Sequence, residues 1–134
     1  MEKLAPLVLA SSSKRRLELL TTIGRIPSKI IASDIDESPF KGELPYELAS
    51  RLSIAKATKV ALENKKCFIL GADRVVACGR KVLPKTNTMD EARMCLELLS
   101  GRRHSVWGGV AIISPTGKLW NVLIMTRVQF KRLS

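Results

Sequence analysis

Short apolar runs alternate with longer amphipathic runs along the 134-residue chain, a pattern typical of strands followed by helices. The first apolar run, residues 7–10, is followed by a polar turn and predicts a short buried strand. The helix expected after it begins at an N-cap, Ser12 or Ser13, and ends near Gly24. Its apolar side chains fall on one face: Leu17, Leu20 and Ile23.

The middle of the chain predicts one strand, one irregular loop and one long helix. A strand starts at about Ser28 and leads into an acidic loop at residues 33–37. Two prolines and a glycine keep residues 38–45 irregular. A helix is expected from about residue 46 to residue 64, because apolar side chains recur there at the helical period. Those side chains are Leu48, Leu52, Ala55 and Leu62.

The next segment predicts an interrupted strand and a hairpin. Residues 68–70 form a buried apolar run, residues 71–73 are expected to break it, and residues 75–78 continue extended. The chain turns back at Gly79, so residues 81–83 return as the second strand of a hairpin.

The last third of the chain predicts a helix and a long hairpin. Thr88 and Glu91 are spaced as a capping box, and the helix that they open ends at Gly101. Two long strands follow, at about residues 104–114 and 119–130, joined by a Pro-Thr-Gly turn. Strands and helices therefore alternate before a C-terminal hairpin, which predicts an α/β fold with a mixed, twisted sheet flanked by helices.

Composition is that of a globular chain, with 46% apolar and 26% charged residues. No apolar run is long enough to span a bilayer, and the first residues lack the apolar stretch of a signal peptide. We therefore expect a cytoplasmic protein with no membrane partner. Cys67, Cys78 and Cys95 stand in apolar runs without metal-ligand spacing, so reduced, buried thiols are expected. The single histidine, His104, has no neighbours that indicate a catalytic triad.

A formal net charge of +11 suits an anionic partner, either nucleic acid, an acidic surface or a polyphosphate. The cations are spread over several short clusters rather than gathered in one block. Aromatic residues make up only 4% of the chain, which disfavours base stacking on single-stranded nucleic acid. A basic nucleic-acid-binding module is therefore the least favoured interpretation of the charge.

The first turn carries a specific chemical signal. Three serines precede three cations, Lys14, Arg15 and Arg16, at the start of the first predicted helix. Free backbone N–H groups, serine hydroxyls and arginine side chains at one point form an anion site, and phosphate fits it best. The alternative is a solvated basic turn, which the helix dipole disfavours because cations at a helix N-terminus are repelled.

Acidic residues at predicted loops and strand ends supply the second part of a candidate site. They are Asp34, Asp36, Glu37 and Asp73. Taken singly, each also fits a solvated loop or a turn. Together with Lys56 and Lys85 they fit metal-assisted attack on a phosphoanhydride, in which carboxylates hold Mg²⁺ and orient the attacking water.

Six motifs, in order along the chain, resemble those of the Maf family, also called septum-formation inhibitor Maf, whose members are nucleoside triphosphate pyrophosphatases. The first, LASSSKRRLELL at residues 9–20, resembles L-A-S-x-S-P-R-R-x-E-L-L. The other five are SDIDE (33–37), RLSIAKA (51–57), LGAD (70–73), LLSGRRHSV (98–106) and VQFKRLS (128–134).

This resemblance implies a Maf/ITPase-like fold and hydrolysis of a nucleoside triphosphate between the α and β phosphates, giving monophosphate and pyrophosphate. It also implies pyrimidine or modified nucleotides as substrates, a divalent metal cation (Mg²⁺ or Mn²⁺), a homodimer, and a role in nucleotide metabolism and septum formation. By position, the catalytic residues would be Asp73, Lys85 and Glu37, with Asp73 as proton acceptor and with Glu37 and Asp73 holding the metal. The substrate-binding residues would be Ser11, Ser13, Arg15, Arg16 and Lys56.

Departures from the family pattern leave other interpretations open. Lys14 replaces a proline, Arg74 stands where threonine follows the aspartate, and Gly108 replaces a threonine. Family members continue past residue 134, so the single Maf-like domain, residues 1–134, is expected to be truncated at its C-terminus. The alternatives to an active enzyme are a catalytically degenerate homologue that binds nucleotide or has no function, and a nucleic-acid-binding module.

Overall fold

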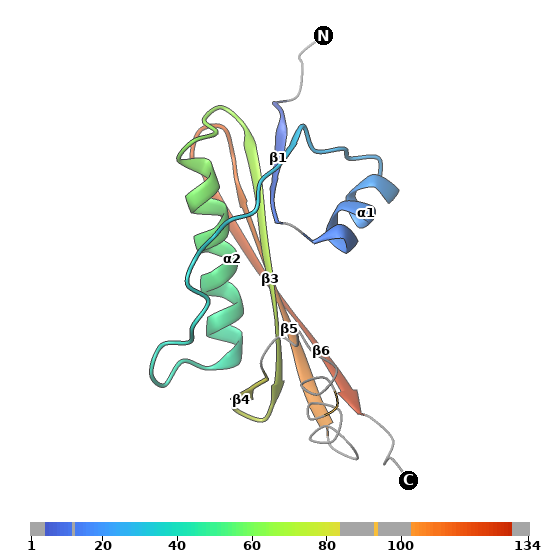
Figure 1. Ribbon diagram of the computed structural model, residues 1–134, viewed down its shortest axis with the longest axis vertical. Helices are drawn as coiled ribbons and strands as arrows, with labels where there is room; N and C mark the ends of the chain where they lie inside the picture. The colour runs from blue at the N-terminus through green and yellow to red at the C-terminus, as the bar shows by residue number, and fades with distance from the viewer. Residues whose placement is uncertain (1–4, 12, 84–92, 94–102, 130–134) are drawn as a thin grey trace.

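The structure is a computed structural model that describes residues 5–11, 13–83, 93 and 103–129 (Figure 1). Its elements, in chain order, are β1 (Leu7–Ala10), α1 (Lys14–Thr22), β2 (Lys29–Ile30), α2 (Pro45–Ala61), β3 (Phe68–Cys78), β4 (Lys81–Val82), β5 (Arg103–Ile113) and β6 (Leu119–Gln129). The first strand has its predicted bounds. The antiparallel pair β5–β6 confirms the predicted long hairpin.

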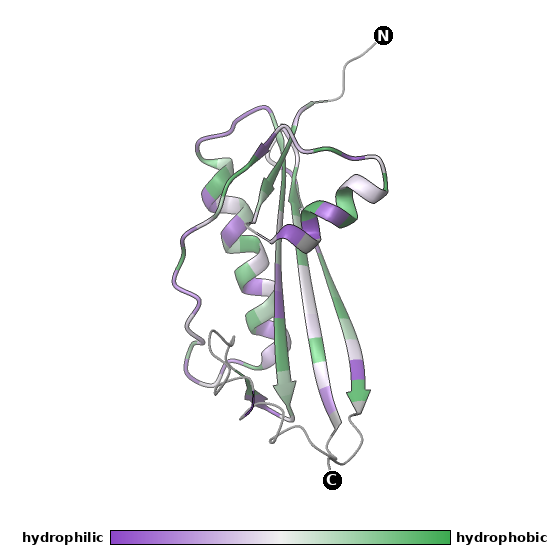
Figure 2. Cartoon of the chain, turned by 45° about the vertical axis from the view of Figure 1, so that its right-hand side comes forward, coloured by the Kyte–Doolittle hydropathy of each residue, from purple (hydrophilic) through white to green (hydrophobic). Residues whose placement is uncertain are grey.

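The strands form one mixed sheet in the order β2-β1-β3-β5-β6, with β4 paired to β3. β1 runs parallel to β2 and β3, whereas β3 is antiparallel to β4 and β5. Figures 1 and 2 show α2 on one side of this twisted sheet and α1 on the other. The predicted α/β fold with a mixed sheet flanked by helices is confirmed.

Helix α2 builds the core by laying its apolar side on the sheet. Its buried apolar side chains are Leu48, Ala49, Leu52, Ala57 and Val60. The sheet residues packed with them are Val8 and Ala10 of β1, Ile69 and Val75 of β3 and Ala111 of β5. Burying a valine or leucine side chain contributes about 1.5–3 kcal/mol, so this helix–sheet contact is a principal source of stability.

Local sequence signals predict where the helices end, but they do not predict how exposed the residues at these ends are. Ser13, one of the two predicted candidates, caps α1, and its Oγ accepts a hydrogen bond from the Arg16 N–H at 3.4 Å. Gly24 follows the cap residue Ile23 with φ +81°. The helical period placed Ile23 and Leu62 on apolar faces, yet they are 72% and 70% exposed. Both are C-cap residues, where the helix ends and the side chain leaves the packed face.

Strand β3 runs from Phe68 to Cys78 without a break, so the predicted interruption at residues 71–73 is wrong. Gly71 is needed for the close approach of α2. A Cβ there would lie 2.6 Å from the backbone oxygen of Ser53 and 2.7 Å from the backbone nitrogen of Ala57. This glycine therefore serves helix packing instead of ending the strand. Asp73 consequently lies inside β3 and not at a strand end.

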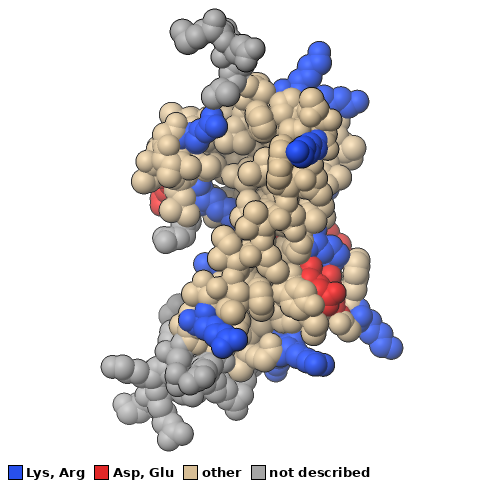
Figure 3. Space-filling model, turned by 180° about the vertical axis from the view of Figure 1, so that it is seen from behind, with Lys and Arg blue, Asp and Glu red and all other residues tan. Residues whose placement is uncertain are grey.

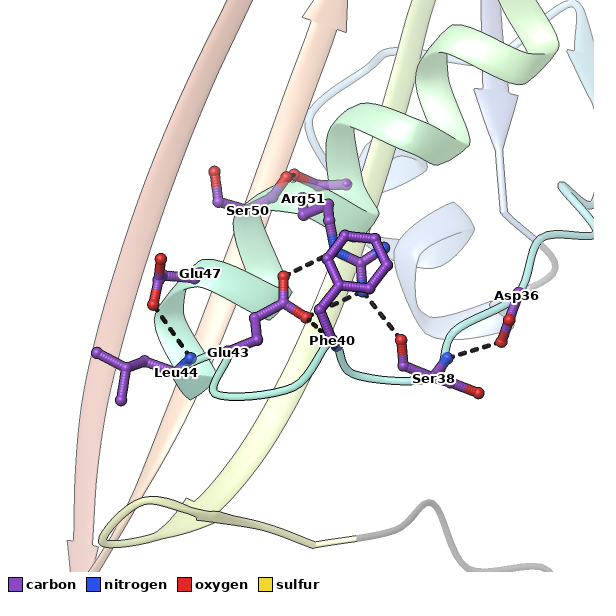
Figure 4. A network of polar contacts seen from close by, with 9 residues as sticks. Asp36, Ser38, Phe40, Glu43, Leu44, Glu47, Ser50 and Arg51 are labelled. Atoms are coloured by element: carbon purple, nitrogen blue, oxygen red, sulfur yellow. Dashed lines mark hydrogen bonds and ion pairs between the residues drawn. The ribbon is translucent and has the colours of Figure 1, made fainter.

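The segment that directly follows the acidic loop, residues 38–43, is fastened to α2 by Arg51 (Figure 4). The guanidinium donates hydrogen bonds to both carboxylate oxygens of Glu43, at 2.7 and 3.0 Å, and to the Ser38 carbonyl at 3.0 Å. The Phe40 ring stacks on it, with 3.8 Å between the guanidinium carbon and the ring centroid. These bonds lower the pKa of Glu43 and raise that of Arg51. They also hold the loop that carries Glu37.

Turns and short strands follow the sequence closely. The β3–β4 hairpin turns at Gly79, and the β5–β6 hairpin turns at Gly117, with φ values of +60° and +91°. Both values lie in the left-handed region that glycine adopts without a steric penalty. The strand expected from about Ser28 is shorter, because β2 pairs with β1 only over Lys29–Ile30.

The structure also bears on the predictions for the cysteines, for the helix after Thr88 and for membrane-spanning segments. Cys67 is a free thiol, as predicted, and Cys67 and Cys78 are both half-buried rather than buried. Cys95 lies outside the described residues. The helix expected to end at Gly101 also lies outside them, except for Arg93. In the part of the chain that the structure describes, no helix has the length and apolar character to cross a bilayer.

Substituting Gly109→Ala should destabilise the fold by about 1–3 kcal/mol, the usual cost of overpacking. A Cβ at Gly109 would lie 2.3 Å from the backbone oxygen of Ala49, which cannot move without shifting α2. Gly108→Ala is the matched control on the same strand, because its Cβ would meet only the Ile124 oxygen at 3.8 Å. Urea unfolding measures both free energies, and equal stability of the two variants would contradict the close approach of α2.

Replacing Glu43→Gln should lower the free energy of unfolding at pH 7 by about 1 kcal/mol, the upper end for ion pairs that reach solvent, because the Glu43 and Arg51 side chains are only 8% and 26% exposed. Because Arg51 lowers the pKa of Glu43, the stabilisation is present above the ordinary carboxyl pKa and is lost as the pH falls through the lowered value. The difference between wild type and variant should therefore vanish in acid. Thermal melts at pH 7 and pH 3 test this, and a difference that grows in acid would refute it.

Candidate functional site

A gap in strand pairing opens one edge of β3. β1 accompanies β3 only as far as the pair Ala10↔Gly71, and β4 joins it at Ala77 and Cys78. Between these pairings the described strands accompany β3 on the β5 side alone. A cavity of about 1170 Å³ opens at this gap, and we call it the notch cavity. Its volume is sufficient for a small organic ligand, which typically needs about 300–1,000 Å³.

The notch cavity collects polar residues from separate parts of the chain. Seven of them lie close to the open edge of β3 or on the elements next to it: Ser11 and Ser13 from the first turn, Arg16 from α1, Glu37 from the acidic loop, Lys56 from α2, and Asp73 and Arg74 from β3; Ser33 and Thr126 line the cavity as well. Six of these seven are residues that the sequence predicted for the site. The exception is Arg74, which the sequence presented only as a departure from a family pattern.

Lys56 joins two carboxylates at the centre of the cavity. Its Nζ lies 2.8 Å from Glu37 Oε1 and 2.8 Å from Asp73 Oδ1. The Asp73 side chain is 1% exposed, the Lys56 side chain 12% and the Glu37 side chain 42%. A buried carboxylate is costly unless it is paired, so the ammonium makes the burial of Asp73 tolerable. The cluster is closed at Asp73 and reaches solvent at Glu37.

The first turn arranges donors around Ser11. Its Oγ accepts hydrogen bonds from the Ser13 backbone N–H at 3.1 Å and from Arg16 Nη1 at 2.8 Å. The Ser11 hydroxyl keeps its own proton as a donor, and the Arg16 guanidinium has further N–H groups. Donors of this kind at a helix N-terminus favour an anion.

Arg16 carries its charge in a partly buried place. Burial lowers its pKa most, the Asp73 carboxylate raises it, the Arg74 charge lowers it, and Glu37 raises it. Arginine nevertheless stays protonated in proteins. The notch cavity therefore contains a cation that its own carboxylates compensate only in part.

Two predicted site residues cannot be placed by their side chains. Arg15 belongs to α1, but its side chain and the whole of Lys85 lie outside what the structure describes. Asp34 and Asp36, from the predicted acidic cluster, do not line the notch cavity. Asp36 accepts a hydrogen bond from the Ser38 backbone N–H at 2.9 Å, and its pKa is lowered by hydrogen bonding first to the Ser38 side chain and then to this N–H.

The sequence could have placed Arg74 at the cavity only if residues 68–78 had been predicted as one unbroken strand. Side chains alternate between the two faces of a strand, so consecutive residues point in opposite directions. With β3 unbroken, Asp73 faces α2 and Arg74 faces the other side of the sheet. Both line the notch cavity, since none of the described strands pairs with this edge of β3 between Gly71 and Ala77.

The donor set fits a hard divalent cation only with help from a ligand. Within the described ranges, no three acidic, histidine or cysteine residues form a ready-made metal cluster. Glu37 and Asp73 nevertheless converge on one point, the Lys56 ammonium. Mg²⁺ commonly takes one or two carboxylates and completes its shell with phosphate oxygens and waters.

The surface charge does not form one continuous basic patch on the visible face. Figure 3 shows Lys and Arg in several separate places, with a group of acidic residues among them. Proteins that bind nucleic acid usually gather their cations on one face or along one helix. This face therefore does not favour a nucleic-acid-binding module.

Sequence comparison finds relatives that match nearly all of this chain. The dTTP/UTP pyrophosphatase of Paramagnetospirillum magneticum is 52% identical over 131 residues, which cover 98% of this chain and 69% of the relative. The dTTP/UTP pyrophosphatase of Mesorhizobium japonicum is 50% identical, covering 99% and 67%. The nucleoside triphosphate pyrophosphatase of Ehrlichia ruminantium is 52% identical, covering 100% and 70%. The chain thus spans about two thirds of the length of these relatives.

Solved structures with low sequence identity share the fold. The Staphylococcus aureus Ham1 protein aligns with a TM-score of 0.59 at 16% identity, over 92% of this chain and 71% of that one. A nucleoside-triphosphatase, dITP/XTP pyrophosphatase, from Mycobacterium abscessus aligns with a TM-score of 0.55 at 15% identity, over 96% and 75%. The family model described as Maf-like protein matches residues 6–134. With this match and relatives at about 50% identity, the chain belongs to the Maf family.

Proposed function

We propose that this protein hydrolyses nucleoside triphosphates, pyrimidine nucleotides among them, between the α and β phosphates to give a monophosphate and pyrophosphate. The observation that carries the proposal is the Lys56 ammonium held between Glu37 and Asp73, beside the serine and arginine donors of the first turn. The relatives named dTTP/UTP pyrophosphatase support the pyrimidine preference.

The first turn would bind the polyphosphate chain of the substrate. Ser11, Ser13 and Arg16 lie at the start of α1, where backbone N–H groups and cationic side chains attract phosphate oxygens. We assign Arg15 and Lys85 to the same task by sequence position. Lys56 would stabilise the negative charge that develops on the phosphates in the transition state, because its Nζ lies within the cavity.

Asp73 would accept the proton of the attacking water. Its Oδ1 receives a hydrogen bond from Lys56 at 2.8 Å, which fixes the orientation of the carboxylate. A positioned general base typically accelerates a reaction by about 10²–10⁴-fold. Glu37, with its side chain 42% exposed at the mouth of the cluster, would reach both solvent and substrate.

The residues that would hold a Mg²⁺ or Mn²⁺ ion are Glu37 and Asp73. Such a cation polarises phosphoryl oxygens and activates water when it is bound. Lys56 now lies between these carboxylates, so the ammonium and the cation would share the same negative charge. The lysine side chain is flexible enough to turn toward the substrate phosphates when the carboxylates gain another partner.

We also propose that the protein works in the cytoplasm, where nucleoside triphosphates are available, and that it forms a homodimer. Strand β6 exposes several large apolar side chains that association would cover: Leu119, Trp120, Val122 and Ile124. Cell fractionation tests the first statement. Sedimentation equilibrium tests the second, and a monomer at all concentrations would contradict it.

Purified protein with Mg²⁺ or Mn²⁺ should release pyrophosphate and monophosphate from dTTP and UTP faster than from purine triphosphates. The measurement is a time course of both products over a panel of triphosphates. Release of orthophosphate would contradict cleavage between the α and β phosphates. Binding of a triphosphate without any turnover would instead support the non-catalytic homologue.

The substitution Asp73→Asn should lower kcat by about 100-fold or more, because the amide cannot accept the water proton. Its carbonyl oxygen can still accept the hydrogen bond from Lys56, so the fold should survive. Asp34→Asn is the matched control, since Asp34 is an exposed carboxylate on the acidic loop that does not line the notch cavity. Unchanged kcat in a folded Asp73→Asn variant, checked by thermal melting, would remove Asp73 from the mechanism.

A further inference from the structure

The two faces of β3 present opposite charges at the notch cavity. Asp73 faces α2, where it is 2% exposed and bonded to Lys56. Arg74, the next residue, is on the other face of the sheet and is exposed. Both residues line the notch cavity. The role proposed above uses the acidic side of this strand and leaves Arg74 unexplained.

Among the residues that the structure describes, Arg74 has no ion pair, unlike Lys56 and Arg51. Lys56 is paired with Glu37 and Asp73, and Arg51 with Glu43. No hydrogen bond or ion pair joins the Arg74 side chain to any other residue that the structure describes. An exposed, uncompensated guanidinium at a cavity is free to receive a ligand anion, often through two parallel hydrogen bonds.

The neighbouring strand leaves space for such a ligand. Arg74 pairs with Gly108 of β5, and Gly108 pairs with Ile124 of β6. A Cβ on Gly108 would meet nothing closer than the Ile124 oxygen at 3.8 Å, so the surface beside Arg74 is open. Residues directly opposite each other on one face of a sheet are the nearest side-chain neighbours. The glycine therefore keeps the approach to the guanidinium clear.

Arg74 also acts on the anion-binding turn across the cavity. Arg16 and Arg74 both line the notch cavity, and repulsion from the Arg74 charge lowers the pKa of Arg16, after burial the largest cause that lowers it. A polyphosphate between them would replace this repulsion by two attractions. Like charges gathered around one cavity are a common mark of a site for the opposite charge.

We propose that Arg74 is a substrate-binding residue of this protein that contacts the polyphosphate chain from the sheet face opposite Lys56. This inference rests on the proposed function, because the anion it would bind is the triphosphate of the substrate. Cations would then contact the chain from both faces of β3, Arg74 from one face and Lys56 from the other. Arg74 contributes binding and does not take part in proton transfer.

The experiment compares wild type with Arg74→Thr, Arg74→Lys and Arg80→Thr. Arg80 is a matched control because it is an exposed arginine on the β3–β4 turn and does not line the notch cavity. Calorimetric titration with inorganic tripolyphosphate in Mg²⁺ buffer gives Kd for the anion alone. Steady-state kinetics with dTTP give KM and kcat for each variant, and thermal melts confirm that each variant is folded.

Arg74→Thr should weaken tripolyphosphate binding and raise KM by about tenfold, the usual effect of losing a hydrogen bond to a charged group. Because the contact is present before and during reaction, kcat should change little. Arg74→Lys should keep only part of the affinity, because the charge remains but the paired hydrogen bonds of the guanidinium are lost, and Arg80→Thr should match wild type.

Three results would overturn the assignment. Wild-type Kd and KM in Arg74→Thr, with pyrophosphate release intact, would refute the inference and leave the proposed function standing. A rise in KM for dTTP without any change in tripolyphosphate binding would move Arg74 from the phosphates to the nucleoside. Wild-type protein that neither binds tripolyphosphate nor releases pyrophosphate would refute the proposed function, and the inference with it.

Discussion

The close approach of α2 to the sheet is the constraint on which this structure depends. Glycines at Gly71 and Gly109 let the helix backbone come within ordinary contact of two neighbouring strands, where any side chain would collide with Ser53, Ala57 or Ala49. This approach sets the height of the helix above the sheet. It thereby brings the Lys56 ammonium to 2.8 Å from Asp73, and the central ion cluster follows from a packing requirement.

The ion cluster itself is better explained by chemistry than by stability. Removing a carboxylate and an ammonium from water costs several kcal/mol per ion, and their attraction often does no more than offset that cost. Apolar residues at Lys56 and Asp73 would pack into the same core without that penalty. Glu37, on a loop that Arg51 ties to α2, completes the cluster at its solvent side. A cluster with a costly buried charge at Asp73 and a solvent-exposed carboxylate at Glu37 is typical of a site that binds a ligand.

The second determinant is the shortness of β1. Because it ends opposite Gly71, no strand in the described part of the chain pairs with that edge of β3 at Asp73 and Arg74. A longer β1 would cover that edge and separate the two faces of the sheet. The chain instead turns away into α1 and brings Ser11 and Arg16 to the same opening. Ligands bind at comparable places in other α/β proteins, where neighbouring connections leave the strand ends toward different sides.

The sequence by itself determined the features that depend on neighbouring residues. The Ser13 cap, the bounds of β1, the glycine turns of both hairpins and the residue types of the site could all be predicted, because each depends on local backbone preference or on motif spacing. Only the tertiary structure decided that Gly71 lies within a strand, since the reason is a helix placed above it. It likewise decided that Asp73 and Arg74 serve two faces of one cavity, because the partner strand ends beside them. Packing between distant segments cannot be predicted from the residue pattern of either segment alone, because it depends on how both are placed in the fold.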